Sequence, residues 1–231
     1  MTIFISKDEE DLGIIPRFIA DKNVKGIYRS LIDFEKVFFQ VDVDFDVIFF
    51  PSARSAQFII DSKKINLNSY DLACTGPQTN DRLMELGYHC EFIGTNSGSP
   101  KEVSKDFGEW LGNRKVFIPH SNRSVLSMIS HVANHQVVST VVYNTILSDA
   151  IIDSSDLYVF SSPSNIHSFF KNNRLKKDSL VIVWGQTSAR CLDQYSYTAD
   201  AILKDGTLQE LHHLIQEILK SRELQTMDSL K

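Results

Sequence analysis

The amino-acid sequence contains a long internal repeat, and this repeat limits the folds that the chain can adopt. Residues 46–50 (Asp-Val-Ile-Phe-Phe) resemble residues 156–160 (Asp-Leu-Tyr-Val-Phe), and each of these apolar runs is followed by a polar corner. Further along, the first copy carries Gly-Pro-Gln-Thr at 76–79, and the second carries Gly-Gln-Thr at 185–187. A repeat of this length indicates a domain duplication.

Both copies alternate between short apolar runs and amphipathic segments. In the first copy, predicted strands begin at Val47, Leu72 and Cys90, and predicted helices follow each of them. This alternation predicts βαβ units and a parallel sheet covered by helices on both faces. The predicted fold class is therefore α/β, with two similar three-layer domains of the flavodoxin-like or Rossmann-like kind.

The second copy ends without the strand-helix-strand unit that completes the first. At the N-terminus, Ile3-Phe4-Ile5 resembles residues 116–118, a helix is predicted over residues 9–20, and a strand follows at residues 26–28. We expect this unit to complete the second copy, with residues 125–133 as the matching helix of the first. The prediction is a discontinuous domain of residues 1–32 plus 145–231, an inserted domain of residues 36–141, and a linker of two crossing strands, 30–35 and 140–146.

The composition excludes several classes of protein. Of the 231 residues, 42% are hydrophobic and 23% are charged, as in globular proteins, and no apolar run is long enough to cross a membrane. A net charge of −5 gives no general attraction for nucleic acid. The three cysteines have neither disulfide nor zinc spacing, and no metal is expected. Because the N-terminus lacks the layout of a secretory signal, we expect a cytoplasmic protein.

Several motifs, in their order along the chain, resemble the uroporphyrinogen-III synthase family. Residues 159–166 are similar to its corner motif, in which an apolar residue precedes T/S-S-P-S-N-V, and residues 185–189 are similar to its G-P-T-T-A turn. Residues 142–145 match its V-Y-x-T motif, and residues 76–79 match its first-domain Gly-x-x-Thr turn. The resemblance covers nearly the whole chain. It implies two α/β domains, one of them discontinuous, joined by a two-stranded ladder.

The resemblance also implies a reaction. Uroporphyrinogen-III synthases are cyclising hydro-lyases of tetrapyrrole and heme biosynthesis, and their substrate is hydroxymethylbilane, a linear tetrapyrrole with eight carboxylates. Loss of its terminal hydroxyl group as water leaves an azafulvene, and a spiro intermediate then gives uroporphyrinogen III with ring D inverted. The implied enzyme needs no cofactor and acts as a monomer. Its substrate is expected to be handed over from hydroxymethylbilane synthase.

Such a reaction needs distributed hydrogen-bond donors rather than a nucleophile. Corners between a strand and a helix direct backbone N–H groups at an anion, so we expect corner residues of both domains, facing a cleft, to bind the carboxylates. Arg54 departs from the family pattern and is a candidate for strengthening anion binding. Tyr143, on the return crossing, is the catalytic candidate, either as a hydrogen-bond donor to the leaving hydroxyl group or as a group that stabilises the cation. The expected substrate-binding residues are Ser52, Arg54, Gln78, Thr79, Ser162, Ser164, Asn165, Gln186 and Thr187.

Each of these assignments has a simpler alternative. Serine, threonine and asparagine at helix starts commonly serve as N-caps, and Tyr143 is equally compatible with a packed aromatic residue of the linker. For the whole chain, the alternative is a noncatalytic two-domain protein that binds an anionic ligand such as a tetrapyrrole. An assay of the porphyrin isomer formed from hydroxymethylbilane distinguishes these readings.

Overall fold

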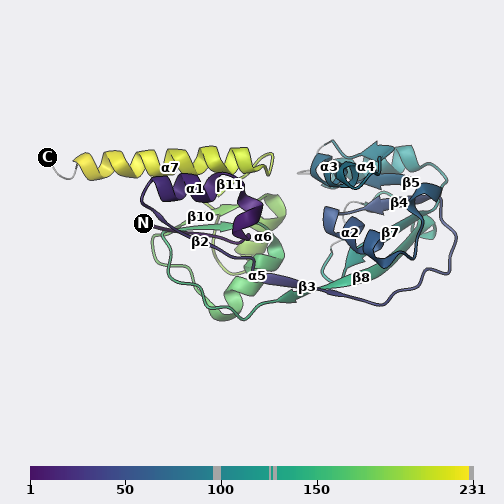
Figure 1. The fold of residues 1–231 in the computed structure, drawn as a ribbon, viewed down its shortest axis with the longest axis horizontal. Helices are drawn as coiled ribbons and strands as arrows, with labels where there is room; N and C mark the ends of the chain where they lie inside the picture. Colours follow the sequence, from purple (N-terminus) through teal and green to yellow (C-terminus); the bar gives the residue numbers. More distant parts are fainter. Residues whose placement is uncertain (96–99, 125, 127–128, 229–231) are drawn as a thin grey trace. The chain divides into compact units, whose positions relative to one another are not determined.

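The chain forms two compact units. The computed structural model describes residues 1–95, 100–124, 126 and 129–228. One unit consists of Met1–Asp33 with Leu147–Lys231, and the other of Phe34–Ile146 (Figure 1). The first is called unit 1 below and the second unit 2. Unit 1 is therefore made from the two ends of the chain.

Unit 1 is built on a five-stranded sheet with the strand order β11-β10-β9-β1-β2. All of its pairings are parallel, and the N-terminal strand lies beside the first strand of the second repeat copy, with Ile3 opposite Leu157. The strands are β1 (Thr2–Ile5), β2 (Lys25–Tyr28), β9 (Leu157–Phe160), β10 (Leu180–Val183) and β11 (Ala201–Ile202).

Helices cover both faces of this sheet. One apolar core lies between the sheet and helices α1 (Ile15–Asp21) and α7 (Leu208–Asp228), which share one side of the sheet in Figure 1. A second core lies under α5 (Pro163–Asn172) and α6 (Gln186–Asp193). Because both faces are covered, the inner strands are apolar along their whole length, as β9 is.

Unit 2 has a six-stranded sheet with the order β3-β8-β7-β4-β5-β6. Helices α2 and α3 cover one core, and α4 covers the other. The strands are β3 (Ile32–Lys36), β4 (Val47–Phe50), β5 (Asp71–Cys74), β6 (Phe92–Ile93), β7 (Val116–Ser121) and β8 (Val137–Leu147). The helices are α2 (Ala53–Ser62), α3 (Pro77–Glu85) and α4 (Pro100–Leu111), with short 3-10 turns η2 (Leu67–Ser69) and η4 (Asn134–Gln136).

The two sheets have the same strand order if the N-terminal strands β1 and β2 are counted as following β11. In unit 2, β7 and β8 lie on the β4 side of the sheet, in the places that β1 and β2 take beside β9 in unit 1. The chain passes from one unit to the other within β3 and within β8, and these two strands are neighbours. The predicted α/β fold class, with two similar three-layer units, is confirmed.

Two predicted helices differ from the structure. The single helix predicted over residues 9–20 is split into a 3-10 turn, η1 (Glu9–Leu12), and α1, because Gly13 adopts a positive φ of 56° and Pro16 occupies the first turn of α1. The helix predicted over 125–133 falls partly on residues outside the described part of the chain. Within it, Ser130–Val132 form a turn and a bend.

Asp156 ties the N-terminal strand to the second copy. Its Oδ2 accepts a hydrogen bond of 2.8 Å from the Thr2 backbone N–H, and its Oδ1 pairs with Lys176 Nζ. In unit 2, Asp46 Oδ2 likewise accepts from the Lys115 backbone N–H at 2.8 Å, and no ion pair with a lysine is recorded for it among the described residues. The hydrogen bond from Lys176, followed by that from Thr2, lowers the pKa of Asp156 below its ordinary value of 3.8.

This geometry predicts a pH-dependent loss of stability. Asp156→Ala is expected to lower the free energy of unfolding of unit 1 by about 1–2 kcal/mol at pH 7. Because the folded-state pKa is depressed, the carboxylate stabilises the protein fully above pH 3.8, and this contribution is lost as the pH falls through the folded-state pKa. Urea titrations at pH 7 and pH 3 would measure the difference. Lys176→Met should weaken the pH dependence and Lys177→Met should not, whereas an Asp156→Ala effect of equal size at both pH values would contradict the assignment.

Candidate functional site

The candidate site of unit 1 lies at the carboxyl end of its sheet, where β1 and β9 are neighbours. The helix after β1 packs on one face of the sheet and the helix after β9 packs on the other. The sheet therefore has its topological switch point between these two strands, where ligands bind in open α/β sheets. In unit 2, β7 and β4 form the corresponding pair.

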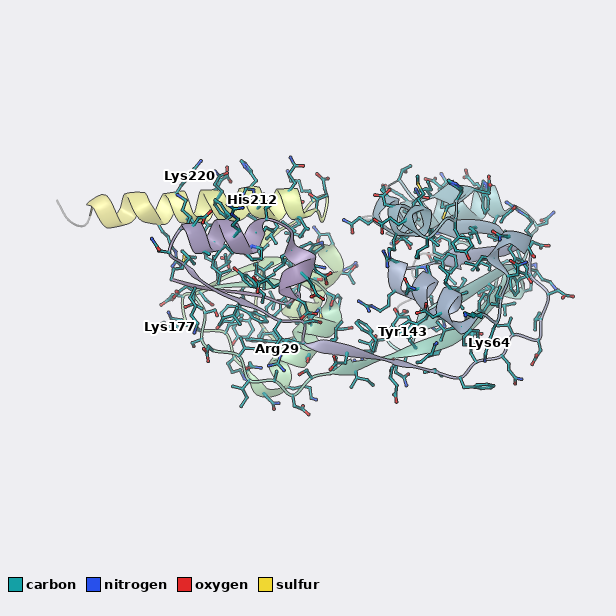
Figure 2. All side chains as sticks on the ribbon, in the orientation of Figure 1. Arg29, Lys64, Tyr143, Lys177, His212 and Lys220 are labelled. Carbon is teal, nitrogen blue, oxygen red and sulfur yellow. The ribbon has the colours of Figure 1, made fainter. Side chains whose placement is uncertain are left out.

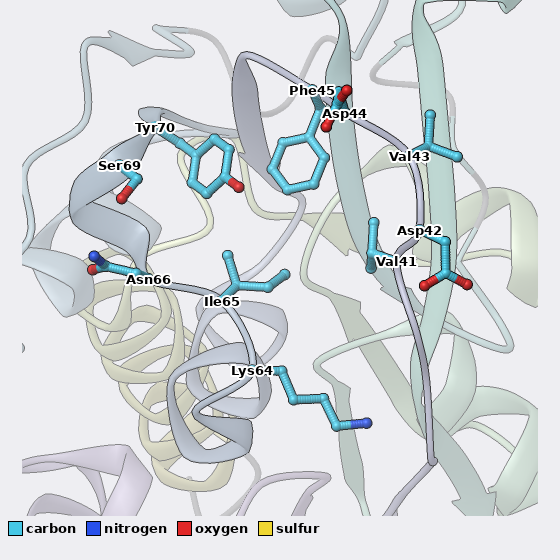
Figure 3. A pocket seen from close by; sticks show the side chains of 10 residues that line it. All are labelled: Val41, Asp42, Val43, Asp44, Phe45, Lys64, Ile65, Asn66, Ser69 and Tyr70. Atoms are coloured by element: carbon cyan, nitrogen blue, oxygen red, sulfur yellow. The ribbon is translucent and has the colours of Figure 1, made fainter.

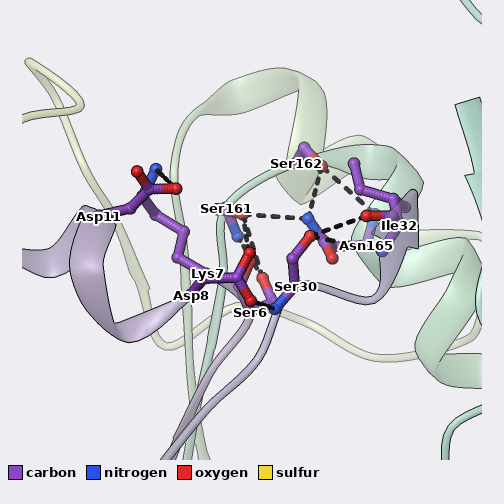
Figure 4. A network of polar contacts seen from close by, with 9 residues as sticks. All are labelled: Ser6, Lys7, Asp8, Asp11, Ser30, Ile32, Ser161, Ser162 and Asn165. Atoms are coloured by element: carbon purple, nitrogen blue, oxygen red, sulfur yellow. Dashed lines mark hydrogen bonds and ion pairs between the residues drawn. The ribbon is translucent and has the colours of Figure 1, made fainter. Parts of the chain in front are cut away.

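Ser6 and Ser161 join the two strands at this point (Figure 4). The Ser161 backbone N–H donates to Ser6 Oγ at 2.8 Å, and the Ser161 hydroxyl group donates to the Ser6 carbonyl oxygen at 2.7 Å. The two hydroxyl oxygens are 3.2 Å apart. These mutual bonds satisfy both serines, so their role is to hold the ends of β1 and β9 together.

Ser52 and Ser162 occupy equivalent N-cap positions. Ser162 Oγ accepts from the Asn165 backbone N–H at 3.3 Å, at the start of α5. Ser52 Oγ accepts from the Ser55 backbone N–H at 3.2 Å, and Ser55 completes a capping box at the start of α2. Both predicted binding serines therefore cap a helix. The Ser52 hydroxyl group donates to Ser55 Oγ at 3.5 Å, whereas among the described residues no acceptor is recorded for the Ser162 hydroxyl hydrogen.

The Gly turns differ from the serine corners because no side chain caps their helices. Gly76 precedes α3 and Gly185 precedes α6, and neither helix start has a side-chain cap. At the start of α6, among the described residues, no acceptor is recorded for the backbone N–H groups of Gln186 and Thr187, so this turn presents backbone donors at a positive helix end. At the start of α3, Pro77 has no N–H, and the Thr79 N–H donates to the Gly76 carbonyl oxygen at 3.1 Å, so the positive helix end contributes more than free N–H groups. Gln186 and Thr187 are exposed on the turn of α6. On α3, Gln78 is exposed and Thr79 is 8% exposed.

The remaining predicted binding residues are placed less directly. The Arg54 guanidinium group lies 3.5 Å from the centroid of the Phe34 ring, so its charge is held over an aromatic face within unit 2. Ser164 is half-buried in the first turn of α5. Asn165 is only 3% exposed, and its side-chain amide is used within unit 1.

Tyr143 lies on β8 of unit 2 (Figure 2) and is 6% exposed. Its ring stacks on Phe58, with centroids 4.7 Å apart and an interplanar angle of 8°, and meets the edge of Phe34 at 5.8 Å. The ring is thus packed, as the simpler alternative expected. Within the described part of the chain, no hydrogen bond is recorded for its hydroxyl group. The only fully buried side-chain polar atom without a partner in that part of the chain is His212 Nε2, so the Tyr143 hydroxyl oxygen is not fully buried. The hydroxyl group therefore keeps contact with solvent.

Lys7 and Trp184 are neighbours of the site that sequence reasoning missed. Lys7 follows Ser6 directly, and its Nζ lies 5.8 Å from the centroid of the Trp184 ring, which stands immediately before Gly185. The Trp184 indole N–H donates to the Gly206 carbonyl oxygen at 2.7 Å, which fixes the ring. The signal was present in the sequence, because Lys7 lies two residues after the predicted strand Ile3–Ile5 and Trp184 ends the apolar run of residues 180–184.

Two other features lie apart from these turns. A cavity of about 420 Å³ in unit 2 is bordered by residues 41–45, 64–66, 69 and 70 (Figure 3). These residues precede β4 and β5 and so lie at the opposite end of the sheet. In unit 1, Cys191 Sγ lies 3.5 Å from His167 Nε2. Burial raises the pKa of the Cys191 thiol, which keeps it protonated and therefore a poor nucleophile.

Among the described residues, no three His, Cys, Asp or Glu side chains gather closely enough to hold a metal ion. No helix in that same part of the chain is long and apolar enough to span a membrane.

Comparison with known proteins identifies relatives of this chain. A family model described as uroporphyrinogen-III synthase HemD matches residues 27–212. The uroporphyrinogen-III synthetase from Helicobacter pylori is 16% identical with a TM-score of 0.67, and the alignment covers 94% of this chain and 99% of that one. A mutant uroporphyrinogen III synthase from Thermus thermophilus is 11% identical with a TM-score of 0.62, over 95% of this chain and 99% of that one. At these identities, the two structures show a shared fold. No curated protein matches the sequence.

Proposed function

The chain belongs to the uroporphyrinogen-III synthase family, and we propose that it carries out this family's reaction on hydroxymethylbilane with the turn and corner residues described above. The enzyme is a cyclising lyase of tetrapyrrole biosynthesis. Its reaction releases water and closes the macrocycle with ring D inverted. The competing spontaneous reaction closes the chain without inversion, so the main task of the protein is to hold one ring carbon, rather than its neighbour, against the cationic carbon.

The observation that best supports this proposal is the pair of uncapped helix starts after Gly76 and Gly185. A substrate with eight carboxylates needs many hydrogen-bond donors. Backbone N–H groups at a helix start bind carboxylates and do not ionise near neutral pH. We infer that Gln78, Thr79, Gln186 and Thr187 lie around such carboxylates. Arg54 and Ser164 would add donors within their own units.

The proposal also covers the compartment, the oligomeric state and the supply of the substrate. The three cysteines are free thiols, which suits a reducing compartment such as the cytoplasm. Each unit has its own two-sided core, which suits a monomer. Transfer of substrate directly from hydroxymethylbilane synthase would limit its spontaneous closure.

An isomer assay tests the function directly. Hydroxymethylbilane would be generated in situ with and without the purified protein, and the porphyrin isomers would be separated after oxidation. We expect type III product only when the protein is present. If the product were type I alone while the protein still bound a tetrapyrrole, the chain would be a noncatalytic binding protein.

Tyr143→Phe tests the proposed role of the Tyr143 hydroxyl group in departure of the substrate hydroxyl. Because the ring stays in its stack with Phe58, stability should not change. Loss of one hydrogen bond made in the transition state should lower kcat for type III formation by about 10- to 30-fold, equivalent to about 1.4–2 kcal/mol. Tyr70→Phe, whose ring stacks on Phe45 in the same unit, is the matched control. An unchanged kcat at saturating substrate would exclude this role for Tyr143.

A further inference from the structure

The serine corners of the two units look alike in sequence, yet their hydrogen bonds run in opposite directions. We propose that Asn165 is a positioning residue that makes the Ser162 hydroxyl group a dedicated donor to a substrate carboxylate, whereas Ser52 at the equivalent corner of unit 2 is occupied internally. This inference rests on the proposed function and assigns different roles to two residues that the sequence treats as equals.

The orientation of the Asn165 amide is fixed by a backbone group. The Leu31 N–H can only donate, and it lies 2.8 Å from Asn165 Oδ1, so this atom must be the amide oxygen. The amide nitrogen then faces the corner, where it donates to Ser161 Oγ and Ser162 Oγ, each at 3.1 Å (Figure 4). Asn165 is only 3% exposed, so water could not replace a lost partner. If the amide group rotated by 180°, its nitrogen would face the Leu31 N–H and the hydrogen bond from Leu31 would be lost.

The number of lone pairs on Ser162 Oγ determines what its hydrogen can do. A hydroxyl oxygen accepts two hydrogen bonds and donates one. Ser162 Oγ already accepts from the Asn165 backbone N–H at 3.3 Å and from the Asn165 side-chain nitrogen at 3.1 Å. Both lone pairs are therefore used. Among the described residues, no acceptor is recorded for the Ser162 hydroxyl hydrogen, which leaves it available to a ligand oxygen.

Ser161 cannot take this role, although it is adjacent. Its hydroxyl group donates to the Ser6 carbonyl oxygen at 2.7 Å, and its oxygen accepts from Asn165 and lies 3.2 Å from Ser6 Oγ. The hydroxyl hydrogen of Ser161 therefore already makes a hydrogen bond within the protein. Of the two serines that Asn165 contacts, only Ser162 keeps a free hydrogen.

Unit 2 provides an internal comparison. The residue equivalent to Asn165 is Ser55, which is 1% exposed and too short to reach beyond its own corner. Ser55 Oγ donates to the Ser52 carbonyl oxygen at 2.7 Å and presents its lone pairs to the Ser52 backbone N–H at 3.3 Å and to the Ser52 hydroxyl group at 3.5 Å. The Ser52 hydrogen therefore has an internal acceptor. The Asn165 amide donates a hydrogen bond to the capping serine of unit 1, whereas the Ser55 hydroxyl oxygen accepts one from the capping serine of unit 2.

The backbone group that binds the Asn165 amide oxygen is itself held in place. Leu31, which it binds, is fixed a second time, because its carbonyl oxygen accepts from Ser168 Oγ at 2.6 Å. The same Ser168 hydroxyl group lies 2.9 Å from the Ser148 carbonyl oxygen. Through Ser168, helix α5 is therefore hydrogen-bonded to the residue directly before β3 and to the residue directly after β8. A donor group held by this network is already oriented before the substrate arrives, which lowers the cost of binding.

The test compares Asn165→Asp with Ser162→Ala in the full-length protein. A carboxylate at 165 can still accept from Leu31, but it accepts from Ser162 instead of donating, so the serine hydrogen turns inward. We expect both variants to raise KM for hydroxymethylbilane by about tenfold with kcat within about threefold, because a ground-state contact is lost. The double variant should raise KM by no more than about twofold beyond either single variant, since one interaction is removed twice.

Two controls separate positioning from folding. Ser55→Ala removes the equivalent residue of unit 2 and should leave KM unchanged even if stability falls. Asn165→Ser copies the unit 2 corner and avoids a buried charge, so it replaces Asn165→Asp should that variant fail to fold, with the same tenfold rise in KM expected. A wild-type KM in the folded Asn165 variants, or KM effects of Asn165 and Ser162 variants that simply multiply, would overturn the proposal.

The readout also separates this inference from the proposed function. Titration with uroporphyrin III, followed by tryptophan fluorescence, measures carboxylate binding without turnover. If wild-type protein formed no type III product, the proposed function would fail, and the titration would still show whether the Asn165 and Ser162 variants lose affinity together. If they bound as tightly as wild-type protein, the positioning role would be wrong.

Discussion

A Thr187→Asp variant is expected to be slightly more stable than the wild-type protein and yet nearly inactive. Thr187 is exposed in the first turn of α6, which has no side-chain cap. A carboxylate there interacts favourably with the positive end of the helix, by about 0.3–1 kcal/mol. If the turn binds a substrate carboxylate, the same charge should cost about 2–3 kcal/mol of binding, or roughly 30- to 150-fold in kcat/KM.

The opposite signs make this prediction decisive. A residue that served only the helix would gain stability from aspartate without losing activity. Thr187→Asn, which is similar in size and uncharged, is the matched control and should change kcat/KM much less. Urea denaturation and the isomer assay on the same preparations give both quantities, and a fully active Thr187→Asp protein would remove this turn from the binding site.

The largest loss of stability is expected for Phe169→Ala. Phe169 is 1% exposed and lies in an aromatic cluster of unit 1, with ring centroids of Tyr158 at 5.4 Å, Phe160 at 5.2 Å and Phe170 at 5.2 Å. Removing its ring leaves a cavity that these neighbours cannot fill, at a cost of about 3–5 kcal/mol. Because domains are stable by only about 5–15 kcal/mol in total, unit 1 should be close to unfolding at room temperature.

The effect should be confined to one unit, since the apolar cores of units 1 and 2 share no residues. The chain has two tryptophans, Trp184 in unit 1 and Trp110 in unit 2. In single-tryptophan backgrounds, urea unfolding monitored at Trp184 should shift to much lower urea, and unfolding monitored at Trp110 should not. Phe38→Ala, at a side chain that is 79% exposed, should change stability by less than about 1 kcal/mol. Equal shifts at both tryptophans would show that the units unfold together.

Much of the site could be located from the sequence, because a strand that ends at a serine or glycine turn places that turn at the carboxyl edge of a parallel sheet. This reasoning placed Ser162, Gln186 and Thr187 at helix starts that follow β9 and β10, where the structure has them; that they bind substrate stays a prediction. It missed Lys7, because the first residues of the chain were matched to the inserted copy as a strand and not examined as a corner. It could not separate a serine that caps a helix from one that also donates, because both lie at the same sequence position.

The sequence alone determined the duplication, the α/β class and the completion of the second sheet by the N-terminal strand, because periodicity and turn residues act over a few neighbouring positions. It did not determine the break at Gly13 or the direction of hydrogen bonds at the two corners. The direction at Ser162 depends on Leu31, which lies 134 positions from Asn165 in the chain and meets it only when the two ends of the chain fold into one unit. A hydrogen bond between distant groups is set by where the fold brings them, and two corners with similar residues therefore came to have opposite polarity.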